Sequence, residues 1–555
     1  MTMMPGMPAS PLLPQFPRFP DRFNLADYLL EHNLSAGRAR KVAVVCGERR
    51  YTYAEIDEQA CRAGNALSEL GVRMEDRVLI VLPDGAEFVA TWLGTLKIGA
   101  VFAMANTIHT ADDYLYYLDY TRAPVAVVHA SVLDRFEAIR ARARHLRVLV
   151  VVGEPDGAVA HRSYDEVVGA ASKTLETAPT SSDDIAGWLF TSGSTGRPKA
   201  AVHFHRDFAY NIETYARQVL LMRESDVTVS VPKLFFGYAT GTNLMFPFAA
   251  GGTTALFHER ATPETMFEMI ARHRPTVLTS VPTMINAMLN LDPSGSRRSD
   301  LSSLRVCVSA GEALPGELYR RWVDTFGIEL LDGIGSAEMF HIYISNRFGE
   351  VRPDSLGRLV PGYEARIVGP DAEAAVAPSA NVADAAEVAA GEQGTLWISG
   401  GSTALCYWQR RESSRETFRG DWCVTGDEFT RDADGYFYYR GRTDDMLKVS
   451  GIFVSPLEIE DCLLGHPAVR EVAVVGCPDD GGLIKPKAFV ALKQGFEPSR
   501  DLAFEFKAFV KGRLSPYKYP RWVEFVAGLP RSDRGKVLRT DLRDGVKGIL
   551  NVTLT

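Results

Sequence analysis

The first half of the chain alternates short runs of β-branched residues with amphipathic helical stretches, and this alternation constrains the fold more than any other feature. Helical patterns cover Tyr53–Leu70 and Ala86–Ile98, and the alternation recurs at Thr228–Val231, Thr276–Ser280 and Arg305–Ser309. Strands separated by helices form parallel sheets that helices cover, so the sequence predicts an α/β fold. The early apolar runs are Val42–Cys46, Val78–Leu82, Val125–His129 and Val148–Val152.

The remainder of the chain has a different pattern. Residues 370–394 are rich in Ala and turn formers, which predicts an exposed loop or hairpin insertion. After Trp408, aromatic strands alternate with polar turns, notably at Gly435–Arg440, which indicates a β-barrel-like part of the large domain. Gly441–Asp445 interrupts this pattern and predicts a domain boundary.

Residues 446–548 are predicted to form a small α+β domain. We therefore divide the chain of 555 residues into a Pro-rich leader (1–21), a large N-terminal domain (22–443) and a small C-terminal domain (444–555). The expected strands of the small domain are Val472–Val475, Lys487–Ala491 and Trp522–Val526, and its expected helix is Leu502–Leu514.

Charge and hydropathy exclude several classes of protein. The chain has 61 Lys and Arg against 69 Asp and Glu, a formal net charge of −8. This balance gives no electrostatic footprint for nucleic acid or an anionic membrane. The absence of a long apolar stretch and of a secretory signal favours a cytoplasmic protein with no membrane partner.

The cysteines and the N-terminal prolines carry weaker signals. Seven widely spaced cysteines without a CxxC pair support neither a disulfide framework nor a zinc site, so we expect reduced thiols. Prolines recur at every third position from Pro5 to Pro20, which would align them along one edge of a polyproline II helix. The leader is either a docking motif or a segment that packs loosely on the body.

The run Thr191–Lys199 (TSGSTGRPK) carries the clearest chemistry. Its hydroxyls, its two glycines and its two cations are the composition of a polyphosphate cradle, although the spacing is not that of a Walker A loop. We therefore expect ATP to be bound here. The candidate residues are Thr191, Ser192, Gly193, Ser194, Thr195, Gly196 and Lys199.

This run resembles the phosphate-binding signature of the acyl-adenylate-forming superfamily, which includes acyl-CoA and aryl-CoA ligases, luciferases and peptide-synthetase adenylation domains. Tyr51–Ile56 (YTYAEI) and Leu96–Ala100 (LKIGA) resemble its early structural motifs. The resemblance covers nearly all of the chain from residue 22 on. It implies ATP and Mg²⁺ as cofactors and a small C-terminal domain that moves between two half-reactions.

Two further segments resemble nucleotide-binding motifs of the superfamily. Ser309–Pro315 (SAGEALP) resembles the segment along the adenine, and Asp332–Glu338 (DGIGSAE) resembles the one that contacts base and phosphate. In the second, Glu338 is implied to bind Mg²⁺. Glu338 and Lys199 are both implied to act in catalysis. The family usually has Thr where Ala337 stands, so one phosphate-directed hydroxyl is missing here. The other implied nucleotide contacts are Ser309, Gly311, Glu312, Asp332, Gly333, Ser336 and Ala337.

The resemblance also assigns residues at the domain boundary and in the small domain. Asp427 is implied to bind the ribose, Arg442 to approach phosphate, and Asp444 to be the hinge. Lys536, in PRSDRGK, is implied to enter the site as a catalytic cation during the first half-reaction. In the second, Val449, Ser450 and Gly451 are implied to approach the pantetheine thiol of coenzyme A.

The segment Lys233–Gly241 (KLFFGYATG) resembles the acid-binding segment of benzoate-type CoA ligases. Aromatic faces at Phe236 and Tyr238 suit a flat ring. Amino-acid-activating relatives commonly have an Asp where Phe236 stands, so an amino acid is disfavoured. His341 either hydrogen-bonds the acid or is a structural histidine. The other candidate acid-binding residues are Ala239, Ile334 and Gly335.

The sequence thus predicts an AMP-forming acid–thiol ligase that converts an aromatic carboxylic acid, ATP and CoA into aroyl-CoA. An adenylation protein that loads a carrier protein would share every ATP motif, and a non-catalytic acyl- or nucleotide-binding homologue is a more distant alternative. We expect a monomer or homodimer. The preferred acid, benzoate or a substituted or alicyclic relative, is left open.

Overall fold

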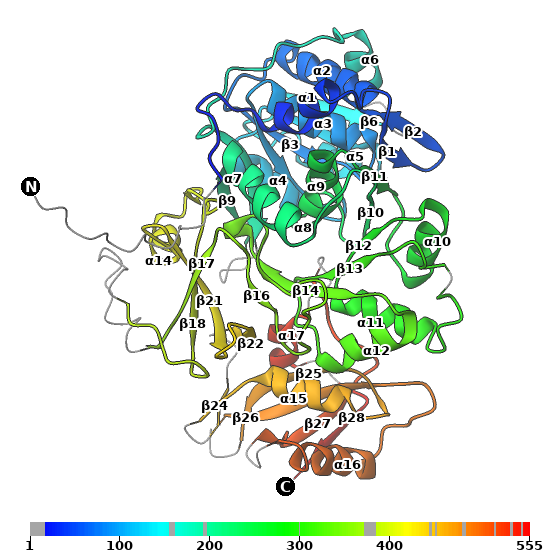
Figure 1. Ribbon diagram of the computed structural model, residues 1–555, viewed down its shortest axis with the longest axis vertical. Helices are drawn as coiled ribbons and strands as arrows, with labels where there is room; N and C mark the ends of the chain where they lie inside the picture. The colour runs from blue at the N-terminus through cyan, green and yellow to red at the C-terminus, as the bar shows by residue number, and fades with distance from the viewer. Residues whose placement is uncertain are drawn as a thin grey trace, which may run out of the picture.

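A computed structural model describes residues 17–554 except 155–160, 192–196, 299, 371–384, 443–446, 450–451, 480–483, 515–517, 533–536 and 546–547. Two helix-covered sheets and one antiparallel sheet make up the large domain, and the small domain lies against one end of it (Figure 1).

The first sheet is mainly parallel and has eight strands among the described residues. Strands β3 to β8 run parallel to their neighbours, whereas β9 and β19 add antiparallel edges. In spatial order the strands are β19 (Cys406–Tyr407), β9 (Lys199–Phe204), β8 (Ile185–Thr191), β4 (Val101–Met104), β3 (Arg77–Val81), β5 (Val125–His129), β6 (Val148–Val152) and β7 (Arg162–Ser163).

In the described part of the chain, the second sheet has nine strands, with a parallel centre from β1 to β14. After β14 the chain turns back into antiparallel β15, so one strand links the parallel centre to an antiparallel edge. In spatial order the strands are β16 (Arg358–Leu359), β15 (Ile342–Ser345), β14 (Leu330–Gly335), β13 (Val306–Ser309), β12 (Val277–Ser280), β10 (Val227–Ser230), β11 (Thr253–Leu256), β1 (Val42–Cys46) and β2 (Arg49–Thr52).

Helices fill the space between and around these sheets. Every residue of α3 (Ala86–Lys97) except Glu87 is buried, which is the pattern of a helix with protein on nearly all sides. It packs on α2 (Tyr53–Glu69) at Gly64 and Gly94, where an added Cβ on Gly94 would lie 2.6 Å from the Gly64 nitrogen. The other helices here are α1 (Leu25–Ser35), α4 (Ala111–Thr121), α5 (Leu133–Ile139), α6 (Tyr164–Ala170), α7 (His205–Asn211), α8 (Gly237–Thr240), α9 (Phe246–Ala250), α10 (Pro263–His273), α11 (Pro282–Leu291) and α12 (Gly316–Phe326).

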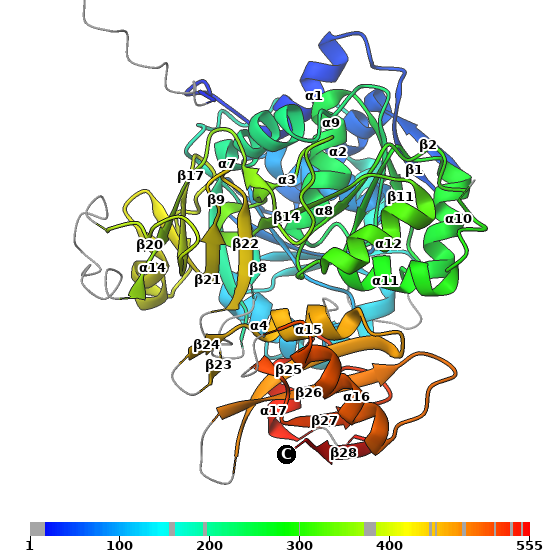
Figure 2. The ribbon, with the colours of Figure 1, turned by 60° about the horizontal axis from the view of Figure 1, so that its bottom comes forward.

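Among the described residues, a five-stranded antiparallel sheet completes the large domain; β20 to β22 lie in the region after Trp408 that was predicted to be β-barrel-like, whereas β17 and β18 precede it. Its hairpin of β21 and β22 leads directly to the predicted domain boundary (Figure 2). The elements are β17 (Glu364–Val368), β18 (Gln393–Ser399), β20 (Phe418–Arg419), β21 (Trp422–Arg431), β22 (Phe437–Arg442) and the helix α14 (Arg411–Thr417).

The small domain has its own core, a four-stranded sheet packed against helices. Buried Phe506 of α16 and Phe525 of β27 join the helix to the sheet. The elements are β23 (Leu447–Val449), β24 (Ile452–Val454), α15 (Pro456–Leu464), β25 (Val469–Pro478), β26 (Ile484–Leu492), α16 (Arg500–Lys511), β27 (Trp522–Phe525), α17 (Arg539–Asp544) and β28 (Leu550–Thr553).

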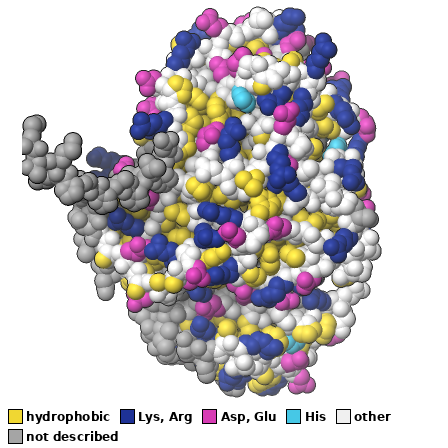
Figure 3. All heavy atoms as spheres, in the orientation of Figure 1, with side chains coloured by type: hydrophobic (Ala, Val, Ile, Leu, Met, Phe, Trp, Pro, Cys, Tyr) yellow, Lys and Arg dark blue, Asp and Glu magenta, His cyan; other side chains and the backbone are white. Residues whose placement is uncertain are grey.

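The predicted fold class is confirmed. Each apolar run that predicted a strand forms one: in the large domain the ends agree to within a residue, whereas β25 and β26 extend up to three residues beyond their expected ends. The expected helix Leu502–Leu514 begins two residues earlier, since Ser499 caps α16 by accepting from the Leu502 N–H. Among the described helices, none has the length and apolarity that crossing a bilayer requires. On the face drawn in Figure 3, acidic and basic side chains are interspersed.

Candidate active site

Both helix-covered sheets, the antiparallel sheet and the small domain line one cleft of about 2360 Å³. It lies at the carboxyl ends of β8, β13 and β14, the position at which α/β folds bind ligands. The predicted residues that line it are Thr191, Lys199, Phe236, Tyr238, Gly311, Glu312, Asp332, Gly333, Ile334, Gly335, Ser336, Ala337, Glu338, His341, Asp427 and Arg442. One tertiary arrangement thus brings together residues that are far apart in sequence.

The two ends of the predicted phosphate-binding run lie side by side, because Thr191 of β8 pairs with Lys199 of β9. The Lys199 ammonium lies 3.7 Å from the centre of the Tyr407 ring, a cation–π contact. The Tyr407 hydroxyl in turn donates a hydrogen bond to Glu338. Burial lowers the pKa of Lys199 and the nearby Glu338 carboxylate opposes that shift. Lys199, Tyr407 and Glu338 therefore form one connected group on the side of the cleft where the phosphate-binding run is predicted, called the phosphate side below.

A buried histidine, His203, holds the backbone next to Glu338. The Ala337 carbonyl lies 2.7 Å from His203 Nε2, and His203 Nδ1 lies 3.1 Å from the Asp207 carboxylate. Both side chains are buried. The His203–Asp207 pair holds the short helical turn that contains Glu338. The contact is to the main-chain carbonyl of residue 337, so it does not depend on whether that residue is Ala or Thr.

The predicted adenine-lining residues offer unpaired polar atoms to a ligand. Ser309 is buried at the end of β13, and one oxygen of Asp332 and the Ser336 hydroxyl are buried without a hydrogen-bond partner. Gly311 has φ +88°, which a residue with a side chain rarely adopts. Burial raises the pKa of Asp332 to about 8. A nucleotide base can satisfy these atoms, so the residues fit ATP.

The predicted ribose and phosphate contacts lie on the β21–β22 hairpin. Arg442 donates to the Asp427 carboxylate at 3.0 Å and to the Thr425 carbonyl at 3.0 Å. Burial lowers the Arg442 pKa, but the charges of Asp427, Tyr439 and Glu338 together raise it overall. Arg442, which is expected to approach phosphate, thus holds in place the Asp427 carboxylate, which is expected to accept the ribose hydroxyls.

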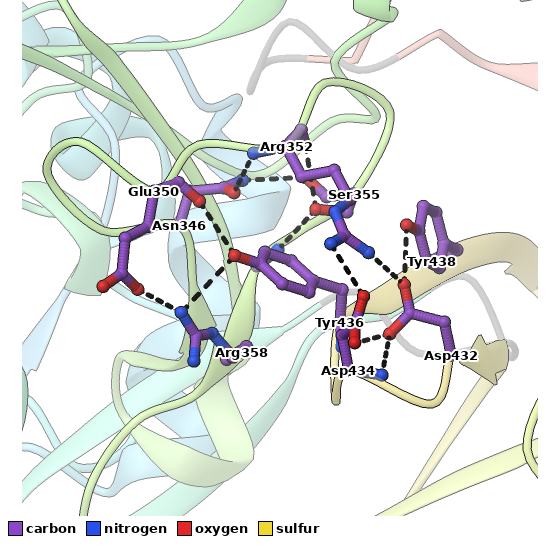
Figure 4. Close-up of polar contacts among 10 residues, drawn as sticks. Asn346, Glu350, Arg352, Ser355, Arg358, Asp432, Asp434, Tyr436 and Tyr438 are labelled. Atoms are coloured by element: carbon purple, nitrogen blue, oxygen red, sulfur yellow. Dashed lines mark hydrogen bonds and ion pairs between the residues drawn. The ribbon is translucent and has the colours of Figure 1, made fainter.

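This hairpin is secured to the large domain at its closed end (Figure 4). Arg352 binds Asp432 and lies 3.0 Å from Asp434, the Tyr438 hydroxyl donates to Asp432 at 3.0 Å, and the Tyr436 hydroxyl donates to the Glu350 carbonyl at 3.1 Å. These contacts fix the end of the hairpin opposite Asp427 and Arg442, so the open end projects into the cleft from a rigid base.

The predicted acid-binding segment forms an aromatic slot with His341. Phe236 is the N-cap of α8, and the rings of Tyr238 and His341 are 5.5 Å apart. His341 Nε2 lies 3.0 Å from the Tyr238 carbonyl and is its hydrogen-bond donor. Burial lowers the His341 pKa to about 3, so its ring is neutral at pH 7. An added Cβ on Gly241 would lie 2.4 Å from the His341 ring, which explains why glycine stands there.

The opposite wall of the slot is strand β14. Gly333 and Gly335 have no room for side chains, since an added Cβ would lie 2.8 Å from the Ile344 carbonyl oxygen and 2.4 Å from that of His341. Between them Ile334 lines the cleft, while Ala239 is fully buried behind the slot. The slot is therefore flat and mostly apolar.

Asp84, which the sequence did not point to, holds the start of the acid-binding segment. Its carboxylate accepts the Leu234 N–H at 2.7 Å, and burial raises its pKa to about 6. Neighbouring Lys233 donates to the Phe257 carbonyl at 2.8 Å. These contacts join the segment before α8 to the residues that follow β3 and β11.

Several predicted residues lie outside the described part of the chain. They are Ser192, Gly193, Ser194, Thr195, Gly196, Asp444, Ser450, Gly451 and Lys536, and for Val449 only the backbone of β23 is described. Arg531, Ser532 and Val537, on either side of the last of these positions, line the cleft.

A Mg²⁺ ion would be held here by few protein groups. Among the described residues, no three His, Cys, Asp or Glu side chains are close enough to chelate a metal. Mg²⁺ commonly uses one or two carboxylates and completes its shell with substrate phosphates and water. The Glu338 carboxylate beside Lys199 fits that pattern.

Comparison with known proteins identifies the chain. The description "AMP-binding enzyme" matches residues 30–408, and "AMP-binding enzyme C-terminal domain" matches residues 458–536. The chain belongs to the AMP-binding enzyme family. This AMP-binding enzyme is 44% identical to benzoate–CoA ligase of Thauera aromatica over 94% of its own length and 96% of the relative's. It is 38% identical to the 4-hydroxybenzoate–CoA/benzoate–CoA ligase of Rhodopseudomonas palustris, with 96% of each covered.

Solved structures give the same relationship. The anthranilate CoA ligase AuaEII, in complex with anthranoyl-AMP, superposes with a TM-score of 0.89 at 40% identity, covering 95% of this chain and 98% of that one. A benzoate CoA ligase from Burkholderia xenovorans LB400 gives a TM-score of 0.85 at 41% identity, covering 94% and 100%. The predicted class is confirmed: the protein is an ATP-dependent aryl-CoA ligase that forms AMP.

Sequence reasoning missed Tyr407, His203, Asp207 and Asp84. His203 and Asp207 have the i, i+4 spacing of a helical pair, a weak signal, while Tyr407 and Asp84 stand in no motif that the sequence revealed. Each acts through a partner on another element. Only folding makes these pairs visible.

Proposed function

We propose that this AMP-binding enzyme activates benzoate or a benzoate with one small ring substituent. In the first half-reaction a carboxylate oxygen attacks the α-phosphorus of ATP, which forms aroyl-AMP and releases pyrophosphate. In the second, the CoA thiolate attacks the acyl carbon, AMP leaves with the bonding electron pair, and the thiol proton passes to solvent. Adenylation is needed because a free carboxylate is a poor electrophile.

The observation that carries this proposal is the flat apolar slot between α8 and β14, in the same cleft as the ATP-facing residues. Phe236, Tyr238 and Ile334 offer apolar surface to a ring, and the glycines of β14 add no side chains to the cleft. The relatives act, by their names, on benzoate, hydroxybenzoates and anthranilate. A ring with at most one small substituent is common to all of them.

Two buried titratable groups support recognition by shape: His341 in the slot, and Asp332, the predicted nucleotide contact on β14. Burial raises the pKa of Tyr238, and Asp332 lies close enough to Tyr238 to raise it further. His341 is neutral at pH 7 because burial lowers its pKa to about 3, and Asp332 is largely protonated because burial raises its pKa to about 8. Neither pairs with a charged ring substituent, and Asp332 does not repel the acid as a full negative charge would. Since the Tyr238 carbonyl engages His341 Nε2–H, we assign His341 to positioning Tyr238 rather than to binding the acyl carboxylate.

The remaining predicted residues have roles on the phosphate side. We assign Thr191, Lys199 and Arg442 to the phosphates and Asp427 to the ribose. When bound, Mg²⁺ would be held by Glu338 and would neutralise phosphate charge. Lys536 is assigned to the charge that develops on the acyl carboxylate and α-phosphate, and Asp444 to the hinge.

A panel of acids tests the proposal. Purified enzyme with ATP and Mg²⁺ is given benzoate, 2-aminobenzoate, 3- and 4-hydroxybenzoate, cyclohexanecarboxylate and hexanoate, with and without CoA. We expect pyrophosphate release with the planar acids and CoA thioester only when CoA is added. Faster release with hexanoate, or thioester formed only on a holo carrier protein, would contradict it.

A further inference from the structure

The large and small domains meet at a polar cluster around Arg531, a residue to which the sequence assigned no role. Arg531 of the small domain donates to the Thr283 hydroxyl of α11 at 2.8 Å, and its guanidinium lies 3.9 Å from the Glu312 carboxylate. Thr283 and Glu312 belong to the large domain and line the cleft. Arg531 therefore connects the small domain to the segment predicted to lie along the adenine.

The large-domain half of this contact is already assembled. One oxygen of Glu312 accepts both the backbone N–H of Thr283, at 3.1 Å, and its hydroxyl, at 2.7 Å. The other oxygen of Glu312 is buried and makes no hydrogen bond, and it is the one that faces Arg531. Thr283 and Glu312 thus form a rigid, negatively charged receptor that needs a cation from outside the large domain.

The small-domain half is equally well supported. Glu471 of β25 lies 2.8 Å from the Arg531 guanidinium. An isolated bridge pairs Arg531 with Val537, and the Leu538 N–H donates to the Pro530 carbonyl at 2.9 Å. Contacts within the small domain therefore hold both the side chain and the backbone of Arg531 in the position from which it contacts the large domain.

A second contact runs along the same line. Asn286, one turn after Thr283 on α11, donates to the Arg470 carbonyl at the start of β25 at 3.2 Å. Figure 1 shows α11 and α12 of the large domain facing α15 and β25 of the small domain. The Arg531 cluster is therefore part of a defined domain interface, with side chains that are roughly one-quarter exposed at Arg531 and Glu471 (26% each).

We propose that Arg531 is a positioning residue for the adenylation half-reaction. By binding Thr283 and Glu312 while Glu471 orients it, Arg531 holds the small domain in the arrangement in which Arg531, Ser532 and Val537 line the cleft. The contact is ionic, partly exposed and small, so it can break when the small domain leaves for the thioester step. This inference rests on the proposed two-step function.

The two half-reactions can be measured separately. Adenylation is followed as pyrophosphate release with benzoate, ATP and hydroxylamine as acceptor, and thioester formation is followed with synthetic benzoyl-AMP and CoA. For Arg531→Ala we expect adenylation to fall by on the order of tenfold or more, because the variant leaves Glu312 buried without its cation. The thioester step should be unchanged or faster, since the small domain must leave the adenylation arrangement for this step and the variant weakens that arrangement.

Two variants control for folding and for charge. Arg513→Ala removes an exposed small-domain arginine that packs on Phe509, and it should leave both half-reactions unchanged. Arg531→Lys keeps the cation but not the fork that spans Thr283 and Glu471, so adenylation should recover in part.

Equal losses in both half-reactions of Arg531→Ala, or no loss in adenylation, would overturn the positioning role. Failure of the proposed function would look different, because wild-type enzyme itself would then release no pyrophosphate with any benzoate. The two failures are therefore separated by the wild-type measurement alone.

Discussion

The acid slot and the phosphate side of the cleft are joined by one strand, β14, yet they handle charge in opposite ways. In and beside the slot, burial favours the neutral forms of His341 and Asp332, with the His341 pKa lowered to about 3 and the Asp332 pKa raised to about 8. On the phosphate side, charges are kept and paired, as with Arg442 and Asp427 at 3.0 Å.

This difference teaches how one cleft can serve two substrates. A neutral slot distinguishes acids by volume, because a ring of the wrong shape leaves gaps or clashes. A charged side recognises triphosphate by electrostatics and tolerates small changes in volume. The comparison therefore predicts that charge substitutions impair ATP chemistry with any acid, whereas volume substitutions change the choice of acid.

Removing the Glu338 charge without changing its size should have the largest effect. In Glu338→Gln we expect adenylation to fall by about 10²–10³-fold, because the expected metal ligand is lost, with a higher Mg²⁺ requirement. The ratio of benzoate to 4-hydroxybenzoate activity should not change. Pyrophosphate release over a Mg²⁺ titration measures both, and Glu58→Gln on the surface of α2 is the matched control. A changed acid ratio would break the comparison.

Changing the slot volume without changing charge should have the next largest effect. The Cβ of Gly241→Ala would lie 2.4 Å from the His341 ring, so the ring must move off the Tyr238 carbonyl. We expect kcat/KM for benzoate to fall by about 100-fold, as for other small misplacements in a site, with the KM for ATP nearly unchanged. Gly169→Ala, where an added Cβ meets nothing within 4 Å, is the control. Parallel losses for acid and ATP would contradict the prediction.

Ionising Asp332 should turn the neutral slot into a charged one. Its pKa is raised to about 8, so between its ordinary value of 3.8 and about 8 the folded protein keeps a proton that the unfolded chain has lost. The free energy of unfolding therefore falls as pH rises through this window, and Asp332→Asn should remove that dependence.

Two measurements check this prediction. Thermal midpoints at pH 5 and pH 8 should converge in Asp332→Asn relative to wild type. In wild type, KM for benzoate should rise severalfold above pH 8 as like charges meet, and it should stay flat in the variant. An identical pH profile in the two proteins would show that Asp332 does not titrate in the slot.

Restoring the missing hydroxyl on the phosphate side should have the smallest effect. His203 holds the Ala337 carbonyl, which Ala337→Thr keeps. We expect a two- to fivefold faster adenylation, of the size of one added hydrogen bond to phosphate, and an unchanged acid preference. Ala337→Val, which adds the same volume without a hydroxyl, should give no gain. A gain in both variants would assign the effect to packing.

Much of this enzyme was predictable from local sequence. Alternating apolar runs gave the strands of both large sheets, because burial on both faces of a parallel sheet leaves a pattern that neighbouring residues share. Motifs placed Thr191, Glu338 and Asp427 at a nucleotide site, and all three line one cleft. The aromatic segment at Phe236 likewise indicated a ring-binding slot.

The contacts that position these residues were not predictable. Tyr407 reaches Glu338 across 69 residues, His203 reaches Ala337 across 134, and Arg531 reaches Thr283 across 248. No local pattern records such a pairing, because each partner would look like an ordinary surface or core residue in its own segment. Protonation is hidden for the same reason: whether His341 is neutral depends on burial by Tyr215, Tyr238 and Phe246, which come from other elements.

The sequence by itself therefore determined the α/β fold class, the reaction class and the segments that carry it. Tertiary structure decided which residues hold those segments in place, which groups of the cleft are charged and how the small domain is attached. The physical reason is that strands, helices and motifs depend on residues that are close in sequence. Desolvation and long-range hydrogen bonds exist only once distant segments pack together.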